Sequence, residues 1–592
     1  MFTPKSGLLL LALANALTVL ASPVRGRIAD VSAADWSALN ATVEGRLGVL
    51  QPLAAPCYLR YEAGSHGPPT SLHTPDQEVC KVAQDNRRNV EFISSQPAGY
   101  HNPYHGTCMT DGHGCPLTKL LVNDATCYQG NVPDYYINVQ KVSDIQAGLK
   151  FAAEHNIPVV VKNTGHDFKG RSAGANSLAI WTHNLQPPIK LSKSFKADKC
   201  KACSGPVLTY GAGQSFQGIY EFAHNNGFMA LGGACPTVGA SGGYITGGGH
   251  SLLTPAHGLG VDNIIQLKVV LPNGTYITAN RCQNQDIFFA VRGGGGASFG
   301  VITETTARVF PEVPLQMAVI AFNKASLDEE VTTILVENGV KWAQDGWGGY
   351  VAGLGDGSSI MLAITPKLTL EKAKLSMKPL IDFAHPLNDG IRYGVEVTTV
   401  KNYWEFLQTP AMQYIGALVN GISIAQASRL VTDKSFKNKG KRKELTEVLS
   451  NMRYGLNMVT PYAFNLPETD KPGGPGEASV TPAWRKAIWH VVMQTAWDFD
   501  GQIEHPPEFF VDQYRKASAM VKPLRDITPD GGAYQNEADA YEPNHIDSFW
   551  GRKNYDRLLR IKKEVDPNNL ITCHHCVGAD PNDSRLSCYP QI

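Results

Sequence analysis

The chain has 592 residues, which is too long for a single hydrophobic core, so two or more structural units are expected. Lysine plus arginine and aspartate plus glutamate are equal, at 53 each. This balance argues against a nucleic-acid partner or an acidic membrane surface. Beyond the N-terminus no apolar stretch is long enough to span a bilayer, so no membrane partner is expected.

Residues 1–21 have the pattern of a secretory signal peptide. Lys5 precedes the apolar run Leu8–Leu13, and a small-residue cleavage pattern ends at Ala21. We therefore expect a protein that enters the secretory pathway or is secreted. Glycosylation sequons, which fit that expectation, begin at Asn40, Asn273 and Asn582.

The cysteines gather near the two ends of the chain, and in an oxidising compartment most of the twelve should be paired. Cys573-His574-His575-Cys576 has the spacing of a metal or redox motif. In a secreted chain with no second CxxC of matching context, a local disulfide or separate bridges are favoured, and no metal is expected. If Cys235 serves another purpose, eleven cysteines remain and one thiol must stay free.

Composition and predicted secondary structure divide the chain into an N-terminal extension and two larger units. Residues 22–132 are rich in loops, proline and cysteine, which predicts an N-terminal extension held by disulfides. Residues 133–315 open with a β-α-β pattern: strand 135–139, helix 142–155 and strand 157–161. Further strands are predicted at 178–181, 207–211 and 300–310, with a hairpin of 264–271 and 276–278 around Asn273-Gly274.

Residues 316–529 alternate predicted strands, such as 359–364 and 488–495, with amphipathic helices, such as 327–343 and 370–383. This alternation is typical of a second α+β unit. The tail, residues 530–592, carries a predicted helix at 555–564. The fold class is therefore predicted to be α+β.

Residues 232–250 are unusually rich in glycine, which disfavours a helix and suits a backbone that passes close to a large ligand. The turn Asn163-Thr164-Gly165-His166-Asp167 follows a predicted buried strand and offers a second set of N–H groups. Neither a G-x-G-x-x-G fingerprint nor a P-loop occurs. These two turns are therefore the candidates for holding a pyrophosphate.

Four motifs occur in an order that resembles a known family. They are N-T-G-H at 163–166, C-P-T-V-G at 235–239 with the glycine pair and triplet after it, R-G-G-G-G-A-S-F-G-V-I-T at 292–303, and a tail motif in two parts, at 549–559 and 565–570. The set resembles the vanillyl-alcohol-oxidase-like flavoproteins of the PCMH type with a berberine-bridge-enzyme-like C-terminus, and within them the secreted fungal isoamyl-alcohol-oxidase-like group. The resemblance covers about 133–315 and 530–572.

The resemblance implies an FAD-binding domain split between 133–315 and 530–592, with an inserted substrate-binding domain, 316–529, built on an antiparallel sheet. In the family the histidine of the first motif bonds the flavin 8α-methyl group and the cysteine of the second bonds C6. These match His166 and Cys235, so two covalent links to FAD are implied. Taken from the residues alone, they are a turn histidine and half of a disulfide. The other implied cofactor-binding residues are Thr164, Gly165, Asp167, Pro236, Thr237, Val238, Gly239, Gly242, Gly243, Gly247, Gly249, Val301, Ile302, Asn554 and Tyr555.

The resemblance also implies an oxygen gate and a catalytic base. Valine at the position of Val238 goes with oxidase behaviour. Tyr534 matches the tyrosine that takes the substrate proton in several members. A free tyrosine has a pKa of about 10, so it needs a neighbouring positive charge or the flavin to act as a base. Because other members use a carboxylate, Glu537 and Asp539 remain rivals.

Two histidines need separate comment. His250 stands where plant members of the family usually carry tyrosine after the three glycines, so the pocket is expected to differ in detail from theirs. His490 lies in the predicted strand 488–495 and is expected to be a satisfied core histidine.

The expected function is that of a secreted FAD-dependent oxidase. A small alcohol, a secondary-metabolite intermediate or a carbohydrate would give a hydride to flavin N5, and dioxygen would accept the electrons to give hydrogen peroxide. The partners are thus a small-molecule substrate and dioxygen. The alternatives are an FAD dehydrogenase that reacts poorly with dioxygen, and a non-catalytic secreted flavoprotein.

Overall fold

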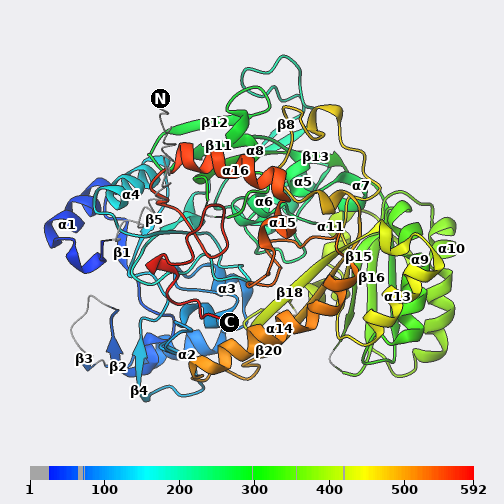
Figure 1. The fold of residues 1–592 in the computed structure, drawn as a ribbon, viewed down its shortest axis with the longest axis horizontal. Coiled ribbons are helices and arrows are strands. Elements are labelled where there is room, and N and C mark those ends of the chain that lie inside the picture. The colour runs from blue at the N-terminus through cyan, green and yellow to red at the C-terminus, as the bar shows by residue number, and fades with distance from the viewer. Residues whose placement is uncertain (1–25, 65–70, 73, 297, 355, 418–419) are drawn as a thin grey trace, which may run out of the picture.

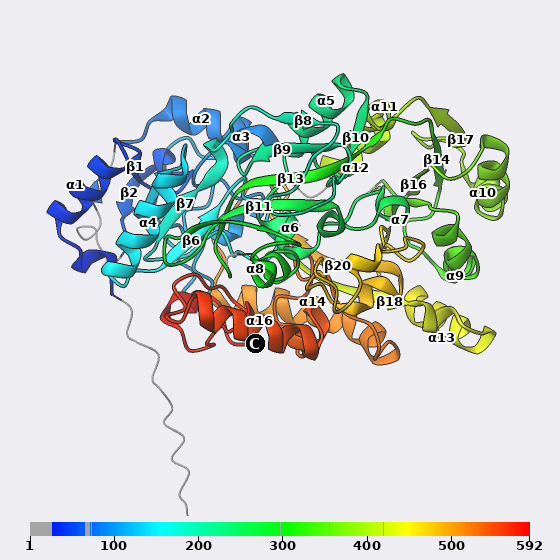
Figure 2. The same ribbon diagram turned by 90° about the horizontal axis from the view of Figure 1, so that it is seen from above.

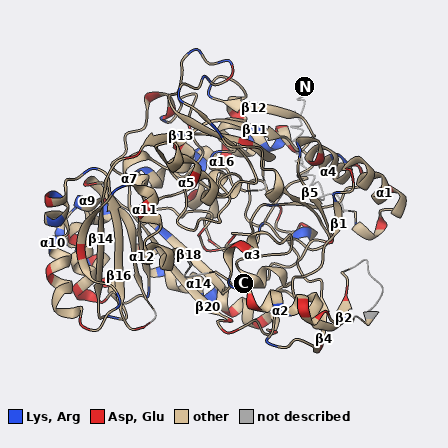
Figure 3. Ribbon diagram, turned by 180° about the vertical axis from the view of Figure 1, so that it is seen from behind, with Lys and Arg blue, Asp and Glu red and all other residues tan. Residues whose placement is uncertain are grey.

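The computed structural model describes residues 26–64, 71–72, 74–296, 298–354, 356–417 and 420–592. The expected signal peptide lies outside these residues. The described chain forms an α+β fold, as predicted, with two β-rich parts side by side (Figure 1). Among the described residues no helix is both long and apolar enough to cross a membrane. Basic and acidic residues are interspersed along both parts, in keeping with the balanced composition (Figure 3).

The first sheet contains the predicted β-α-β unit. Strands β5, β7 and β6 run parallel and β1 pairs antiparallel with β5. The run of β-branched residues in β6 explains why this segment is a buried strand. Ile571 of the tail makes a parallel bridge to Val159 at the free edge of β6, so the tail completes this sheet. The strands are β1 (Leu47–Val49), β5 (Tyr135–Asn138), β6 (Val159–Lys162) and β7 (Leu178–Trp181), and helix α4 (Val142–Glu154) connects β5 to β6.

The second sheet is antiparallel, in the order β12-β11-β13-β9-β8, with β10 also paired to β13. The hairpin predicted around Asn273-Gly274 is present, and Gly274 has a φ of 82°, which favours glycine at that position. Helices α5 (Phe216–Asn225) and α8 (Gln285–Ala290) lie in the same part of the chain. The strands are β8 (Lys190–Ser192), β9 (Val207–Gly211), β10 (Phe228–Ala230), β11 (Ile264–Val270), β12 (Tyr276–Asn280) and β13 (Val301–Pro311).

The glycine-rich stretch differs from the prediction in one respect, because it contains a short helix, α6 (Gly243–Gly247). The helix starts after Gly242, whose φ is 61°, and the Thr246 hydroxyl donates to the Gly242 carbonyl at 2.9 Å. Ile245 and Thr246 are buried. Tertiary packing therefore outweighs the low helix propensity of glycine over this single turn.

The third sheet has seven antiparallel strands in the order β17-β14-β16-β15-β19-β20-β18. Alternate residues of β16 face opposite sides: Met361 packs in the core under the helices, whereas Leu362 packs in a core that includes Phe216 of α5. The sheet thus has helices on one face and the first part of the chain on the other. Its strands are β14 (Leu315–Phe322), β15 (Gly348–Gly353), β16 (Ser359–Thr365), β17 (Val395–Val400), β18 (Ser423–Thr432), β19 (Gly455–Met458) and β20 (Ala487–Trp497).

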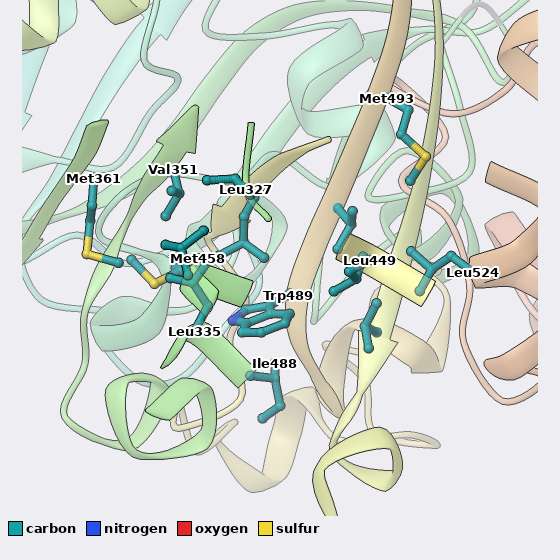
Figure 4. Packing of buried hydrophobic residues seen from close by; sticks show 14 of the residues in the cluster. Leu327, Leu335, Val351, Met361, Leu449, Met458, Ile488, Trp489, Met493 and Leu524 are labelled. Atoms are coloured by element: carbon teal, nitrogen blue, oxygen red, sulfur yellow. The ribbon is translucent and has the colours of Figure 1, made fainter. Parts of the chain in front are cut away.

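The helix-side core of this sheet is centred on large apolar side chains. Trp489 of β20 lies near Leu335 and Met458 in Figure 4, and all three belong to one buried cluster. Burying such side chains contributes roughly 1.5–3 kcal/mol each to folding. The covering helices are α9 (Glu329–Gln344), α10 (Leu370–Ala384), α13 (Lys439–Ser450) and α14 (Pro507–Ile527).

The N-terminal extension and the tail lie against the first part of the chain. Extension helices α1 (Ala33–Thr42), α2 (Gln77–Asp85) and α3 (Val90–Ser94) accompany a small sheet of β2 (Tyr58–Glu62), β3 (Ser71–Leu72) and β4 (Asn123–Tyr128). Tail helix α16 (Arg552–Val565), preceded by α15 (His545–Phe549), runs beside α8, where Arg557 binds Asp286 at 2.8 Å (Figure 2).

The predicted disulfides are present. Five bridges use ten of the twelve cysteines, and the Cys108–Cys588 bridge ties the extension to the tail. Cys573 and Cys576 pair locally, as favoured by the sequence analysis. Cys235 and Cys203 are free, so the odd thiol expected from the count is Cys203. The other bridges are Cys57–Cys80, Cys115–Cys127 and Cys200–Cys282.

Candidate active site

Both backbone turns singled out in the sequence line one groove between the first and second sheets. The turn after β6 supplies one wall and the glycine-rich stretch the other. Gly239 is confined to glycine by this approach, because a Cβ there would lie 2.3 Å from the Asn163 amide. Of the residues predicted to bind a cofactor, the groove is lined by Thr164, Gly165, His166, Asp167, Val238, Gly239, Gly242, Gly243, Val301 and Ile302.

Two nucleophilic side chains meet beside this groove. Cys235 Sγ lies 3.9 Å from His166 Nε2, and Thr237 Oγ1 is 2.8 Å from the same nitrogen. The His166 ring stacks on His101, with ring centroids 3.5 Å apart. Burial lowers the pKa of His166 to about 3 and raises the pKa of the Cys235 thiol. The imidazole is therefore neutral and keeps a lone pair for bond formation.

A buried ion pair supports the histidine turn. Arg171 Nη2 lies 2.9 Å from Asp167 Oδ1, and each side chain is 9% exposed. Although burial acts against it, the Arg171 guanidinium holds the pKa of Asp167 below its ordinary value. Arg171 also donates to Asn536 Oδ1 at 3.1 Å. The pair thus links the turn that carries His166 to the tail.

Tyr534 of the tail is held by the side chain of Asn536. The amide nitrogen of Asn536 donates to the Tyr534 oxygen and to the Gly243 carbonyl, both at 2.8 Å. A Cβ on Gly247 would lie 2.1 Å from that amide nitrogen, so only glycine fits there without displacing Asn536. Burial and then the charge of Glu537 raise the pKa of Tyr534, while Asn536 acts in the opposite direction.

Glu537 forms a buried network with two histidines. Its carboxylate oxygens lie 2.9 Å from His250 Nε2 and 3.6 Å from His490 Nδ1. The rings of both histidines contact the Tyr534 ring, with centroids 5.2 and 5.8 Å away. Burial alone would raise the pKa of Glu537, but His250 holds it below its ordinary value. Burial lowers the pKa of His490 to about 4. The network is a carboxylate between two imidazoles, beside Tyr534.

The sequence predicts that His490 is a core histidine with satisfied hydrogen bonds. The structure agrees with its burial but differs in its hydrogen bonding. His490 is fully buried, but its Nε2 has no hydrogen-bond partner in the described chain, and its Nδ1 lies 3.2 Å from Asn457. His250 Nδ1 is also without a partner there. Two imidazoles and a carboxylate can hold a cation, but metal-bound histidines almost always donate their other nitrogen to an acceptor. The arrangement therefore suits proton exchange better than metal binding.

Three predicted residues lie elsewhere. Asp539 accepts from the Ser518 hydroxyl at 2.6 Å and from the Tyr541 N–H at 2.8 Å, next to Arg525 of α14. Of the three candidate bases, Tyr534 and Glu537 are therefore together and Asp539 is separate. Asn554 donates to the Val480 carbonyl, and Tyr555 accepts the Gly578 N–H, so neither lines the groove. The remaining predicted residues, Pro236, Gly247 and Gly249, belong to the glycine-rich wall without lining the groove themselves.

Sequence reasoning missed the contact between His101 and His166. His101 lies in the loop-rich extension, where no periodicity or motif marks it. His250 was noted only as a departure from a family pattern, and nothing in the sequence connects it with Glu537, 287 residues away. These contacts depend on the tertiary packing of segments that are distant in the chain.

Two backbone turns thus form the walls of the groove, with a histidine on one and a cysteine on the other, which fits the flavin site that the resemblance implies. Residues 133–280 match the family model described as "FAD binding domain", and residues 533–577 match "Berberine and berberine like". The chain is 33% identical to an FAD-linked oxidoreductase of Aspergillus flavipes, over 96% of both proteins. The chain therefore belongs to the FAD-linked oxidoreductases with a berberine-like C-terminal segment.

Two further comparisons agree. The chain is 30% identical to a VAO-type flavoprotein oxidase of Thermothelomyces thermophilus, over 94% of the chain and 92% of that protein. The crystal structure of a VAO-type flavoprotein from Myceliophthora thermophila has a TM-score of 0.79 at 27% identity, and the match covers 94% of this chain and 97% of that one. The resemblance inferred from the four motifs is thus confirmed, as is FAD as the cofactor.

Proposed function

We propose that the protein is an oxidase whose FAD is attached through both His166 and Cys235. The supporting observation is the 3.9 Å separation of Cys235 Sγ and the neutral His166 Nε2 beside the groove. The 8α-methyl group and C6 both belong to the benzenoid ring of the flavin, with C7 between C6 and C8, so two nucleophiles a few ångströms apart can each reach one of them. The glycine-rich walls offer N–H groups to the pyrophosphate without requiring a lysine or arginine.

The covalent proposal is tested by acid precipitation. The wild-type pellet should stay yellow, His166→Ala should remain yellow through Cys235, and the variant with both His166→Ala and Cys235→Ala should release its flavin. Mass spectrometry of tryptic peptides assigns each link. Release of flavin from the acid-treated wild type would contradict the proposal.

The substrate is proposed to bind between the groove and the face of the inserted sheet that carries His490. When bound, FAD supplies the hydride acceptor. Tyr534 is proposed to take the substrate proton, with Glu537 as the alternative base. Because burial and Glu537 raise the pKa of Tyr534, this role needs the positive charge of Arg171 and the bound flavin to favour the ionised phenol. Either role agrees with the close packing of Tyr534 against His250 and His490, because an imidazole beside the base can take the proton onward.

Dioxygen is proposed as the electron acceptor, giving hydrogen peroxide. Val238 lines the groove and supports this proposal through the family pattern given above. The decisive experiment is steady-state oxygen consumption with a panel of alcohols, carbohydrates and secondary-metabolite phenols, with peroxide measured in parallel. If flavin is reduced by a substrate in the panel but dioxygen is not consumed, the protein is a dehydrogenase instead.

Export through the secretory pathway is proposed from residues 1–21. Two sequon asparagines, Asn273 and Asn582, are exposed, and Asn40 is half-buried, with its side-chain oxygen accepting from the Leu47 N–H. Edman sequencing of the protein from a eukaryotic culture medium should begin near Ser22. A glycosidase shift should come mainly from Asn273 and Asn582, because these positions are the accessible ones.

A further inference from the structure

A segment of the N-terminal extension, residues 94–102, packs directly on the turn that carries His166. The His101 N–H donates to the Gly165 carbonyl at 3.2 Å. Gly165 has a φ of 84°, and a Cβ there would lie 2.3 Å from the carbonyl oxygen of Gly99. Only glycine therefore lets the backbone of the turn come this close to the extension.

The side chains of the two segments meet in a stack of imidazole rings. The centroids of the His101 and His166 rings are 3.5 Å apart, and the rings are 12° from parallel. The Ser94 hydroxyl holds His101 through a contact of 3.0 Å to Nε2, and both residues are buried. The Thr237 hydroxyl lies 2.8 Å from His166 Nε2. With His101 on its face and Thr237 at its edge, the His166 ring is held in one orientation.

A buried lysine beside the stack disfavours protonation of either ring. Lys162 is 1% exposed, directly precedes the turn, and donates to the Gln96 carbonyl of the extension at 3.0 Å. Burial, followed by His166 and Lys162, lowers the pKa of His101 well below its ordinary value. Burial and Lys162 likewise lower the pKa of His166. Two neutral rings can stack at this distance without the repulsion between two imidazolium ions.

The extension segment is itself anchored on its other side, at the start of β18. The Gly421 N–H donates to the His101 carbonyl at 3.1 Å. The Ile424 N–H donates to Asn102 Oδ1 at 2.8 Å, and the Asn102 amide donates to the Ile424 carbonyl at 3.2 Å. The backbone that carries the His101 ring is thus held between the histidine turn and the inserted sheet.

We propose that segment 94–102 positions the flavin-linking turn, and that His101 is the positioning residue that holds the His166 ring in the orientation needed for covalent attachment to FAD. This inference rests on the proposed attachment through His166. Forming that carbon–nitrogen bond removes one hydrogen from the 8α-methyl group and one from the ring. These two hydrogens, with their electrons, reduce one dioxygen to hydrogen peroxide. His101 takes no part in the bond and acts through His166 by fixing its orientation.

The test follows both links by mass spectrometry of tryptic peptides while the full chain is incubated with added FAD in air. His101→Leu removes the flat ring at similar volume, and should slow formation of the His166 link about 2- to 10-fold, the range expected for loss of an aromatic stack. The Cys235 link should form at the wild-type rate. His101→Phe keeps a flat ring and should restore most of the rate of the His166 link.

The matched control is His257→Leu. His257 stacks on Phe310 with ring centroids 3.9 Å apart and does not line the groove. This variant removes an equivalent stacked imidazole elsewhere, so both links should form at the wild-type rates.

Equal rates of the His166 link in the wild type and His101→Leu would overturn the proposal. Equal slowing by His101→Leu and His101→Phe would also refute it, because a flat ring would then not be what holds His166. If His101→Leu does not fold, Ser94→Ala decides: it loosens His101 and should slow the His166 link alone, and an unchanged rate would refute the proposal. Absence of flavin from the wild-type His166 peptide would instead contradict the proposed attachment, so the two failures are distinguishable.

Discussion

Replacing Arg171 with methionine should destabilise the fold more than the loss of any single hydrogen bond would, because it leaves a buried carboxylate without its ion-pair partner. Asp167 is 9% exposed and would keep only the backbone N–H groups of Lys169 and residue 171. Breaking a buried ion pair by removing one partner costs about 3–5 kcal/mol. For 592 residues, an unfolding entropy of about 2.1 cal/mol/K per residue makes a loss of about 4 kcal/mol equivalent to about 3 °C in Tm.

The assay is differential scanning calorimetry of the holoenzyme at neutral pH, with flavin fluorescence as a second probe. The double variant, Arg171→Met with Asp167→Asn, removes both charges. Its Tm should fall by less than half as much as the Tm of Arg171→Met alone. The deficit of the single variant should also shrink as the pH falls, because protonation neutralises the stranded carboxyl. If Arg171→Met lowers Tm by less than about 1 °C, or if the double variant is less stable than the single one, the charge argument is wrong.

Three further substitutions test the site. The pKa of His490 is about 4 in the fold and about 6.5 when unfolded, so stability is lost as the pH falls through this window. Between pH 7.5 and 5.5 His490 alone contributes a loss of about 1.3 kcal/mol. Other buried histidines, such as His105 and His166, add to the total loss, so urea titrations should show that His490→Gln makes it smaller by that amount. Tyr534→Phe should retain FAD yet slow flavin reduction about 10²- to 10⁴-fold, and an unchanged rate would point to Glu537. Val238→Ile should slow reoxidation by dioxygen more than reduction in stopped flow, because one added methylene fills space beside the flavin; equal effects would make Val238 a packing residue.

The parts of the fold that sequence predicts well are those with strong local patterns. Strands β7 and β9 begin and end at the predicted residues, because each is a short, largely apolar run bounded by polar or turn residues. Asn273-Gly274 fixes its hairpin because the turn needs a positive φ that glycine adopts at no cost. The local signal at these positions agrees with the tertiary structure.

Sequence-based expectations differ from the structure where contacts depend on the direction of a side chain or on packing between segments far apart in the chain. Asp539 has the spacing of the family motif, but its carboxylate turns to Ser518 and the end of α14. Cys108–Cys588 spans 480 residues, and no sequence argument distinguishes it from other pairings of the early and late cysteines. His490 matches the pattern of a core histidine, and only the approach of Glu537 from the tail gives it another role.

The candidate site is built from four segments that no single domain contains. His166 follows the first sheet, Cys235 lies on the glycine-rich wall, His490 belongs to the inserted sheet, and Tyr534 comes from the tail. The tail is the element that joins them. It pairs with β6 through Ile571, contacts Arg171 through Asn536, and meets both imidazoles through Glu537. Because the contacts of Asn536 and Glu537 belong to one short segment, 534–537, which also carries Tyr534, a shift of this segment would move the candidate base and the wall of the groove together. The berberine-like segment therefore ties the groove to the inserted sheet that carries His490.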